Sequence, residues 1–131
     1  MNNIPSQILP TAYFGPVQYF AHFASSGRVI IEQYDNYSRQ TYRNRCAILG
    51  ANGKINLSIP VKKLNGTKTL VKDILIDYST PWQKIHRHSI VSAYRNAPFF
   101  EFYFEEYDWV FSKRTDYLIE LNTNITRQLI A

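Results

Sequence analysis

The sequence predicts an α/β fold, in which a small and mostly N-terminal sheet with a β-hairpin is covered by three to four helices. A mixed α+β arrangement fits the same pattern. Short β-branched segments gather in the first half of the chain, and Asn52-Gly53 separates two apolar segments, which is typical of a hairpin. In the second half, apolar residues recur at intervals of three and four, which predicts helices. A chain of 131 residues is typical of one domain, so we expect a single domain over residues 1–131.

The first predicted elements are a strand, a helix and a second strand. Residues 8–14 predict a short strand, because Pro10 limits its pairing. Pro16 suits the first position of a helix, which we expect to end at residues 25–27. Residues 28–32 are short and β-branched, which predicts a buried strand.

The hairpin is the clearest local prediction. Residues 46–49 and 55–59 flank the Asn52-Gly53 pair, which favours a type I′ turn, and the second segment alternates between apolar and polar residues. A basic loop over residues 62–68 follows, and residues 71–77 predict a further strand.

The second half predicts helices. Residues 80–83 fit a capping box, with Thr80 as the cap, and the helix that follows should extend to about Ala97. Residues 100–111 have aromatic side chains at helical spacing, although so aromatic a segment also fits a strand. Thr115 is expected to cap a last helix. Its apolar stripe reaches Ala131 without a Gly or Pro, which indicates that the natural domain continues further.

The composition excludes several classes of protein. No apolar segment of about eighteen residues is present, so we expect no membrane span. The N-terminus has neither the basic nor the apolar region of a secretory signal. Cys46 is the single cysteine, which excludes an internal disulfide and agrees with a cytoplasmic protein. We predict no metal site, because His86 and His88 diverge on a helix, and the sequence leaves any cofactor unknown.

The positive charge is concentrated in the first half. The net charge is +5, and residues 28–72 contain nine Lys or Arg but only two acids, whereas residues 73–131 contain six basic and eight acidic residues. A basic surface of this kind suits an anionic small molecule, and less well a nucleic acid. A solvated basic face without a partner is the alternative.

The most unusual segment covers residues 35–45. Its arginines alternate with Tyr and amide side chains, which suits bidentate recognition of phosphate or carboxylate. If the segment is a strand, one face carries Arg39, Thr41, Arg43 and Arg45. The alternative is an exposed loop whose arginines pair with acids of the second half.

His86 is the candidate general base. It lies with Trp82, Ile90 and Tyr94 on one face of the predicted helix, whereas His88 points to the opposite side. A histidine in an apolar stripe is either a hydrogen-bonded core residue or a base at a pocket wall. Cys46 lies in an apolar strand, where cysteine is usually inert, so we expect no Cys46–His86 dyad.

Several blocks together give the chain a family resemblance. They are Leu9-Pro10 with Tyr13-Phe14-Gly15-Pro16, Gln33-Tyr34-Asp35 with Tyr37, Thr41 to Arg45, Leu57 to Val61, Trp82 with His86 and Tyr94, and Ala97 to Tyr103. In order and spacing the chain resembles the WbqC-like proteins. The resemblance implies a cytoplasmic protein linked to surface-polysaccharide or O-antigen assembly, without naming a reaction. The family's polar pattern falls on Tyr13, Gln33, Asp35, Arg43, Asn44, Arg45, His86 and Tyr94.

We therefore expect an enzyme of transferase type that acts on an activated sugar, nucleotide or amino-acid-type anionic substrate. His86, Asp35 and Tyr94 are the candidate catalytic residues. The candidate substrate-binding residues are Tyr13, Gln33, Arg43, Asn44 and Arg45. Two alternatives remain: a non-enzymatic basic module that binds an acidic partner or nucleic acid, and a subunit whose aromatic helices dock on another protein. The sequence leaves the oligomeric state open.

Overall fold

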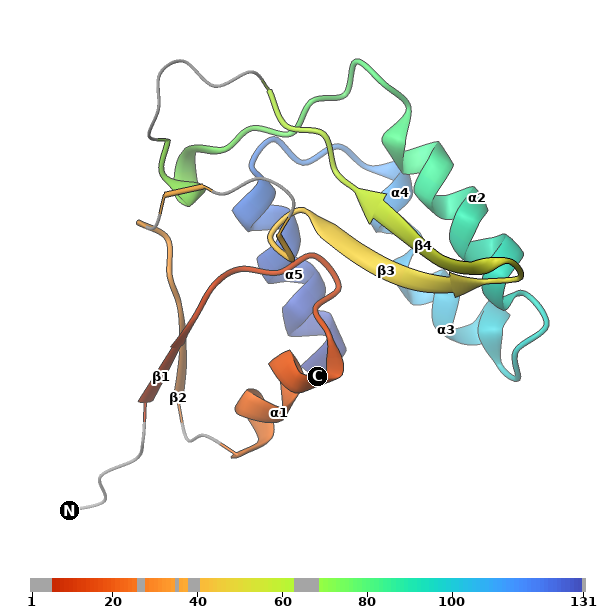
Figure 1. Cartoon of the computed structure of the whole chain (residues 1–131), viewed down its shortest axis with the longest axis horizontal. Helices are drawn as coiled ribbons and strands as arrows, with labels where there is room; N and C mark the ends of the chain where they lie inside the picture. The colour runs from red at the N-terminus through yellow and green to blue at the C-terminus, as the bar shows by residue number, and fades with distance from the viewer. Residues whose placement is uncertain (1–5, 26–27, 35, 38–40, 63–68, 131) are drawn as a thin grey trace.

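The computed structural model describes residues 6–25, 28–34, 36–37, 41–62 and 69–130, and Figure 1 shows their arrangement. The predicted mixture of short N-terminal strands and later helices is confirmed. The strands form two separate two-stranded sheets instead of one small sheet. Among the described residues no helix is long and apolar enough to cross a bilayer.

The first sheet is a parallel pair. Strand β1 (Ser6–Leu9) pairs with β2 (Arg28–Ile31), and helix α1 (Val17–Ser25) connects them. Strand β1 therefore ends before Pro10, earlier than the predicted strand, which extended over residues 8–14. The Pro10 carbonyl instead accepts a hydrogen bond of 2.7 Å from the Tyr19 hydroxyl, which ties the loop to α1.

The predicted hairpin is confirmed, but its turn lies one residue earlier than expected. Strand β3 (Arg45–Gly50) pairs antiparallel with β4 (Gly53–Ser58), so Ala51 and Asn52 form the loop. A type I′ turn would need positive φ at both loop residues. Among the described residues only Gly53 of this region has it, with φ of 116°.

The strand predicted over residues 71–77 is wrong. The segment begins with a short 3₁₀ helix, η1 (Val71–Asp73), and then forms single β-bridges at Leu75 and Ile76. Its backbone groups bond to several different segments; for example, Ile76 donates its N–H to the Asp116 carbonyl over 2.8 Å. The apolar residues that predicted a strand are core residues of an irregular segment.

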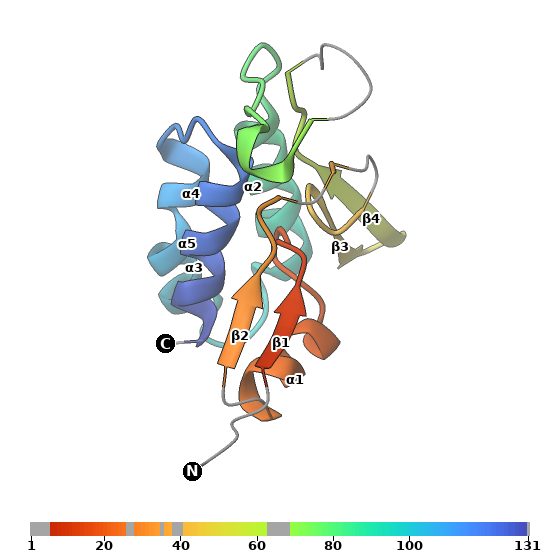
Figure 2. The same cartoon turned by 90° about the vertical axis from the view of Figure 1, so that its left-hand side faces the viewer.

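Four helices make up most of the second half: α2 (Trp82–Tyr94), α3 (Phe100–Tyr107), α4 (Trp109–Ser112) and α5 (Leu118–Ile130). The aromatic segment is helical as predicted, with a break at Asp108. Helix α2 packs against both β3 and α4. Figure 2 shows α3, α4 and α5 on one side of α2 and the hairpin on the other.

Both predicted helix caps are wrong. The cap position of α2 is Pro81, without a side-chain hydrogen bond, and Gln83 instead donates to the Val110 and Lys113 carbonyls over 3.0 and 2.7 Å. Helix α5 begins three residues after Thr115. The backbone of Thr115 exchanges hydrogen bonds of 2.7 and 2.8 Å with the Tyr78 hydroxyl. At Gln83 a tertiary partner takes the side chain that was expected to cap the helix, and at Thr115 the backbone is held by Tyr78 before the helix begins.

The core lies between the hairpin and α5. Tyr13, Ile59, Ile74, Ile76, Leu118, Leu121 and Ile125 are almost completely buried there. The stripe predicted for the last helix faces the centre of the molecule as far as Ile125, including the fully buried amide of Asn122, whereas its last member, Leu129, is exposed. This core fixes the segment around Tyr13 and the hairpin relative to one another.

Candidate functional site

An aromatic cleft of about 410 Å³ lies between β3 and the helices α2 and α3. It is lined by Phe14, Cys46, Ala47, Ile48, Ile90, Tyr94, Ala97, Pro98, Phe100, Tyr103, Phe104, Tyr107 and Phe111. Its volume is in the range of ligand pockets, roughly 300–1,000 Å³. We call these residues the aromatic cleft throughout.

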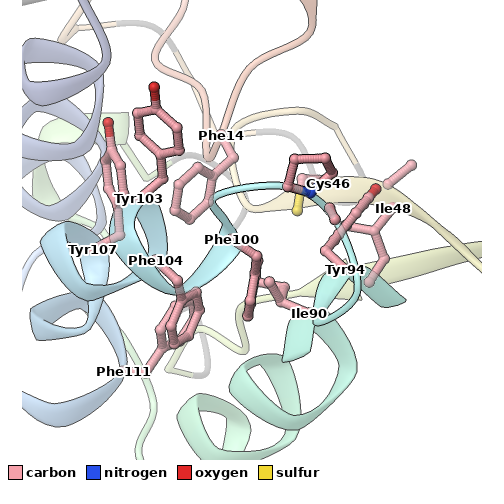
Figure 3. Close-up of a pocket in the computed structure, with 13 residues that line it drawn as sticks. Phe14, Cys46, Ile48, Ile90, Tyr94, Phe100, Tyr103, Phe104, Tyr107 and Phe111 are labelled. Atoms are coloured by element: carbon pink, nitrogen blue, oxygen red, sulfur yellow. The ribbon is translucent and has the colours of Figure 1, made fainter. Parts of the chain in front are cut away.

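Two walls face one another in the cleft. Figure 3 shows Phe14, Tyr103 and Tyr107 on one side and Ile48 and Tyr94 on the other. The rings of Phe14 and Tyr107 meet edge to face at 6.2 Å between centroids. The walls come from three parts of the chain that are distant in sequence, so the cleft exists only in the folded molecule.

The free edge of β3 borders this cleft. The Ile59 N–H donates a hydrogen bond of 2.7 Å to the Asn44 carbonyl, and this bond continues the β3–β4 ladder. The even-numbered residues of β3 therefore direct their backbone N–H and C=O groups toward β4. In an antiparallel pair the intervening residues direct their N–H and C=O groups outward. Arg45, Ala47 and Leu49 therefore present theirs away from β4. The Leu49 N–H donates to the hydroxyl of Tyr94 over 3.2 Å, which places this edge at the cleft wall.

Backbone strain is concentrated at the same place. Among the described residues, the non-glycine residues with positive φ are Phe14, at 43°, and Phe99, at 62°. Phe14 lines the cleft, and Phe99 lies between the lining residues Pro98 and Phe100. A bulky residue in the left-handed region costs roughly 1–3 kcal/mol, and such residues cluster at functional sites.

A buried hydrogen-bonded pair, Tyr13 and His86, lies beside the cleft. The Tyr13 hydroxyl is 2.9 Å from His86 Nδ1, and His86 Nε2 is 3.0 Å from the Ser58 carbonyl. A carbonyl only accepts, so Nε2 carries the proton and Nδ1 accepts from Tyr13. Burial lowers the pKa of His86 to about 4, although the hydrogen bond to Ser58 opposes this shift. The imidazole is thus neutral near pH 7, with both nitrogens engaged.

Cys46 is a neutral thiol at the cleft. Its side chain is buried, and burial raises its pKa to about 12. A protonated thiol is a poor nucleophile. Cys46 therefore contributes apolar surface and not a thiolate.

Residues 11–131 match the WbqC-like protein family, which covers the cleft, the hairpin and all helices. The chain belongs to this family. No curated protein and no solved structure matches it.

In this WbqC-like domain, the arginine segment forms a turn where it is described, not the strand considered above. The Arg43 carbonyl accepts from Asn122 Nδ2 over 2.7 Å, and Arg43 Nη1 donates to the Thr41 hydroxyl over 3.4 Å. Asn44 is buried, and its Nδ2 donates to the Ile59 carbonyl over 3.1 Å. Arg45 is half-buried at the first position of β3.

The fold brings some of the predicted site residues together. Tyr13 and His86 touch, and the Tyr13 N–H donates to the Tyr42 carbonyl over 2.8 Å, next to Arg43. Tyr94 lies at the cleft. Gln33 is exposed and belongs to another region, since its carbonyl accepts from the Lys72 N–H. Asp35 and most of the basic loop, residues 63–68, lie outside the described residues.

Sequence reasoning missed most of the cleft. The sequence pattern places Phe14 at the end of a predicted strand, and it places Phe104, Tyr107 and Phe111 on aromatic helices that could dock on another protein. The density of aromatic residues around Pro98 was the available signal. Among the described residues no group of three or more His, Cys, Asp and Glu could hold a metal ion.

Proposed function

We propose that this WbqC-like domain acts on an anionic activated substrate of surface-polysaccharide metabolism, with the apolar part of the substrate in the aromatic cleft. The observation that carries the proposal is the cleft itself, which is apolar, of ligand size and bordered by strained backbone. Concave apolar sites with a few polar groups at the rim are the usual form of a small-molecule site. Family membership supports the metabolic setting.

Arg45 and Arg43 are the proposed partners of the anionic group. Arg45 begins β3, and the next three residues of that strand line the cleft. A guanidinium at the end of a cleft wall suits a phosphate or carboxylate that leaves the cleft at this end. Arg45 has no acidic partner among the described ion pairs.

In this proposal the buried His86 is a positioning residue. His86 holds the hydroxyl of Tyr13, and Tyr13 precedes Phe14, whose left-handed backbone directs its ring to the cleft wall. Tyr94 is the proposed proton donor at the cleft wall, because its hydroxyl accepts from Leu49 and keeps its own proton to donate. Asn44 supports the turn that carries Arg43 and leads into Arg45.

Thermal unfolding with a ligand panel tests the proposal. The panel contains nucleotides, sugar nucleotides, amino acids and acyl-CoA compounds. A ligand at a hundred times its dissociation constant adds about 2.7 kcal/mol to the free energy of unfolding, and the melting temperature rises accordingly. We expect one anionic class to raise it, and Arg45→Ala to weaken that ligand at least tenfold. Lys54→Ala, an exposed basic residue at the far end of the same hairpin, is the matched control.

Two results would overturn the proposal. One is the absence of a shift with every anionic small molecule. The other is binding that Arg45→Ala and Phe104→Ala both leave unchanged. An acidic macromolecule that binds instead, with affinity falling steeply as salt rises, would favour the non-enzymatic basic module.

A further inference from the structure

We propose that the aromatic cleft and the free edge of β3 together bind an acyl-pantetheine thioester. The acyl chain enters the cleft, the amides of the extended pantetheine arm pair with the strand edge, and the phosphate end lies toward Arg45. This inference rests on the proposed function and names the substrate class.

The lining of the cleft selects an apolar group. Its walls are aromatic and aliphatic, and the thiol of Cys46 is protonated. A sugar ring placed there would lose hydrogen bonds of its hydroxyl groups, which costs free energy when no partner replaces water. An acyl chain loses none and gains burial against rings such as Phe100 and Phe104, which stack at 5.1 Å.

The edge of β3 selects an extended chain with amide groups. Ala47 lines the cleft and directs its N–H and C=O outward, by the ladder pattern established above. No hydrogen bond of these two groups occurs among the bonds of the described residues. An exposed strand edge pairs with extended amide-containing chains, whose hydrogen bonds mimic an added strand. The pantetheine arm has two amides and meets this requirement.

The positive charge at one end of the β3 edge determines which way the ligand lies along it. From Arg45 to Leu49 the edge is about 13 Å long, at roughly 3.3 Å per residue. Its first residue is cationic, and at the other end the Leu49 N–H is already bonded to Tyr94. The phosphate end of the ligand therefore belongs at Arg45, and the amides at Ala47. A plain apolar peptide would use the edge but would leave Arg45 without an anion.

Isothermal titration calorimetry with the full chain tests this binding mode. The probes are CoA, acyl-CoAs of increasing chain length and the free fatty acid of each length. We expect affinity to rise with acyl length, and acyl-CoA to bind at least tenfold more tightly than CoA or the free acid. Phe104→Ala should remove most of the dependence on chain length, because it opens the cleft.

Ala47→Pro tests the strand edge. Proline removes only an outward N–H there, so the ladder to β4 keeps its bonds. We expect at least a tenfold loss of acyl-CoA affinity. Asn56→Pro is the matched control, because Asn56 is the cross-strand partner of Ala47 and directs its N–H to the opposite edge. If either variant fails to fold, amide hydrogen exchange of the natural chain replaces it: acyl-CoA should protect the Ala47 amide and not that of Asn56.

The outcomes separate this inference from the proposed function. Affinity that is independent of acyl length, or an Ala47 amide that gains no protection, overturns it. A sugar nucleotide that binds through Arg45, without any binding of acyl-CoA, overturns it and leaves the proposed function standing. Binding of an extended apolar peptide in place of acyl-CoA also overturns it, in favour of strand addition by a protein. If no anionic ligand binds, both this inference and the proposed function are overturned.

Discussion

The imidazole of His86 lies between two fixed partners, the Tyr13 hydroxyl at 2.9 Å and the Ser58 carbonyl at 3.0 Å. Of the two neutral tautomers, only the one with its proton on Nε2 satisfies both. Protonation of Nδ1 would place a charge in the core and would require the Tyr13 hydroxyl to accept the hydrogen bond that it now donates. One histidine thus joins the segment before the cleft, the end of β4 and helix α2.

Because the pKa of His86 falls from 6.5 to about 4 on folding, the protein should lose stability as pH falls through this window. Above pH 6.5 the histidine is neutral in both states, and its contribution is complete. Below that pH the unfolded chain binds a proton that the folded protein does not, which costs up to about 3 kcal/mol by pH 4. Urea unfolding of the natural chain and of His86→Gln at pH 7 and 4.5 measures this loss of stability.

Gln is the suitable replacement, because its amide can accept from Tyr13 and donate to Ser58 without titrating. The difference in free energy of unfolding between the two pH values should be smaller in the variant. Equal pH dependence in both proteins would show that His86 titrates alike in the folded and unfolded states.

The hairpin of β3 and β4 is the element that forms the cleft wall and supplies its free edge. Its turn depends on Gly53, which has a φ of 116°. Residues with a side chain rarely adopt this backbone conformation. A Cβ at this position would meet no atom within 4 Å, so any cost of a substitution comes from the backbone alone. The hairpin therefore offers a clean measure of turn strain.

Gly53→Ala should lower the free energy of unfolding by about 1–2 kcal/mol, because alanine is strained in this conformation. The melting temperature should fall by roughly 4 °C or more for a domain of this size. Ala51→Gly, in the same loop, should change it less. A Gly53→Ala variant as stable as the natural chain would contradict the turn described here.

At the scale of the whole molecule, a buried amide joins the last helix to the turn that precedes the hairpin. Asn122 lies on α5, is fully buried and donates to the Arg43 carbonyl over 2.7 Å. The bond spans 79 positions of the chain. It holds the turn that carries Arg43 and leads into Arg45, so the position of the proposed anion site depends on the last helix.

Asn122→Ala should cost about 1–3 kcal/mol of stability, since it leaves the Arg43 carbonyl without this donor and opens space in the core. It should also weaken the anionic ligand identified for this domain. Chemical denaturation and the ligand titration measure the two effects. Asn124→Ala, an exposed position on the same helix, should leave both values unchanged. If Asn122→Ala leaves the ligand affinity unchanged, the position of the anion site does not depend on α5.

Much of the architecture could be predicted from local pattern. The hairpin, the helical nature of residues 100–111 and the opposite faces of His86 and His88 all follow from spacing, whereas spacing left open whether His86 is a core residue. Wrong predictions fell where tertiary partners compete with local ones. Gln83 donates to carbonyls near α4 instead of closing a capping box. Residues 71–77 bond to several segments, so their apolar pattern marked burial and not a strand.

By itself, the sequence determined the class of fold, the family and the residues with unusual chemistry, because these depend on residue type and spacing along the chain. Only the tertiary structure decided which of these residues meet. It paired Tyr13 with His86, separated Gln33 from both, and brought Phe14, β3 and α3 together around one cleft. Such contacts join segments distant along the chain, and local periodicity contains no information about them. The free edge of β3 likewise follows from hydrogen-bond register, which exists only once the strands are paired.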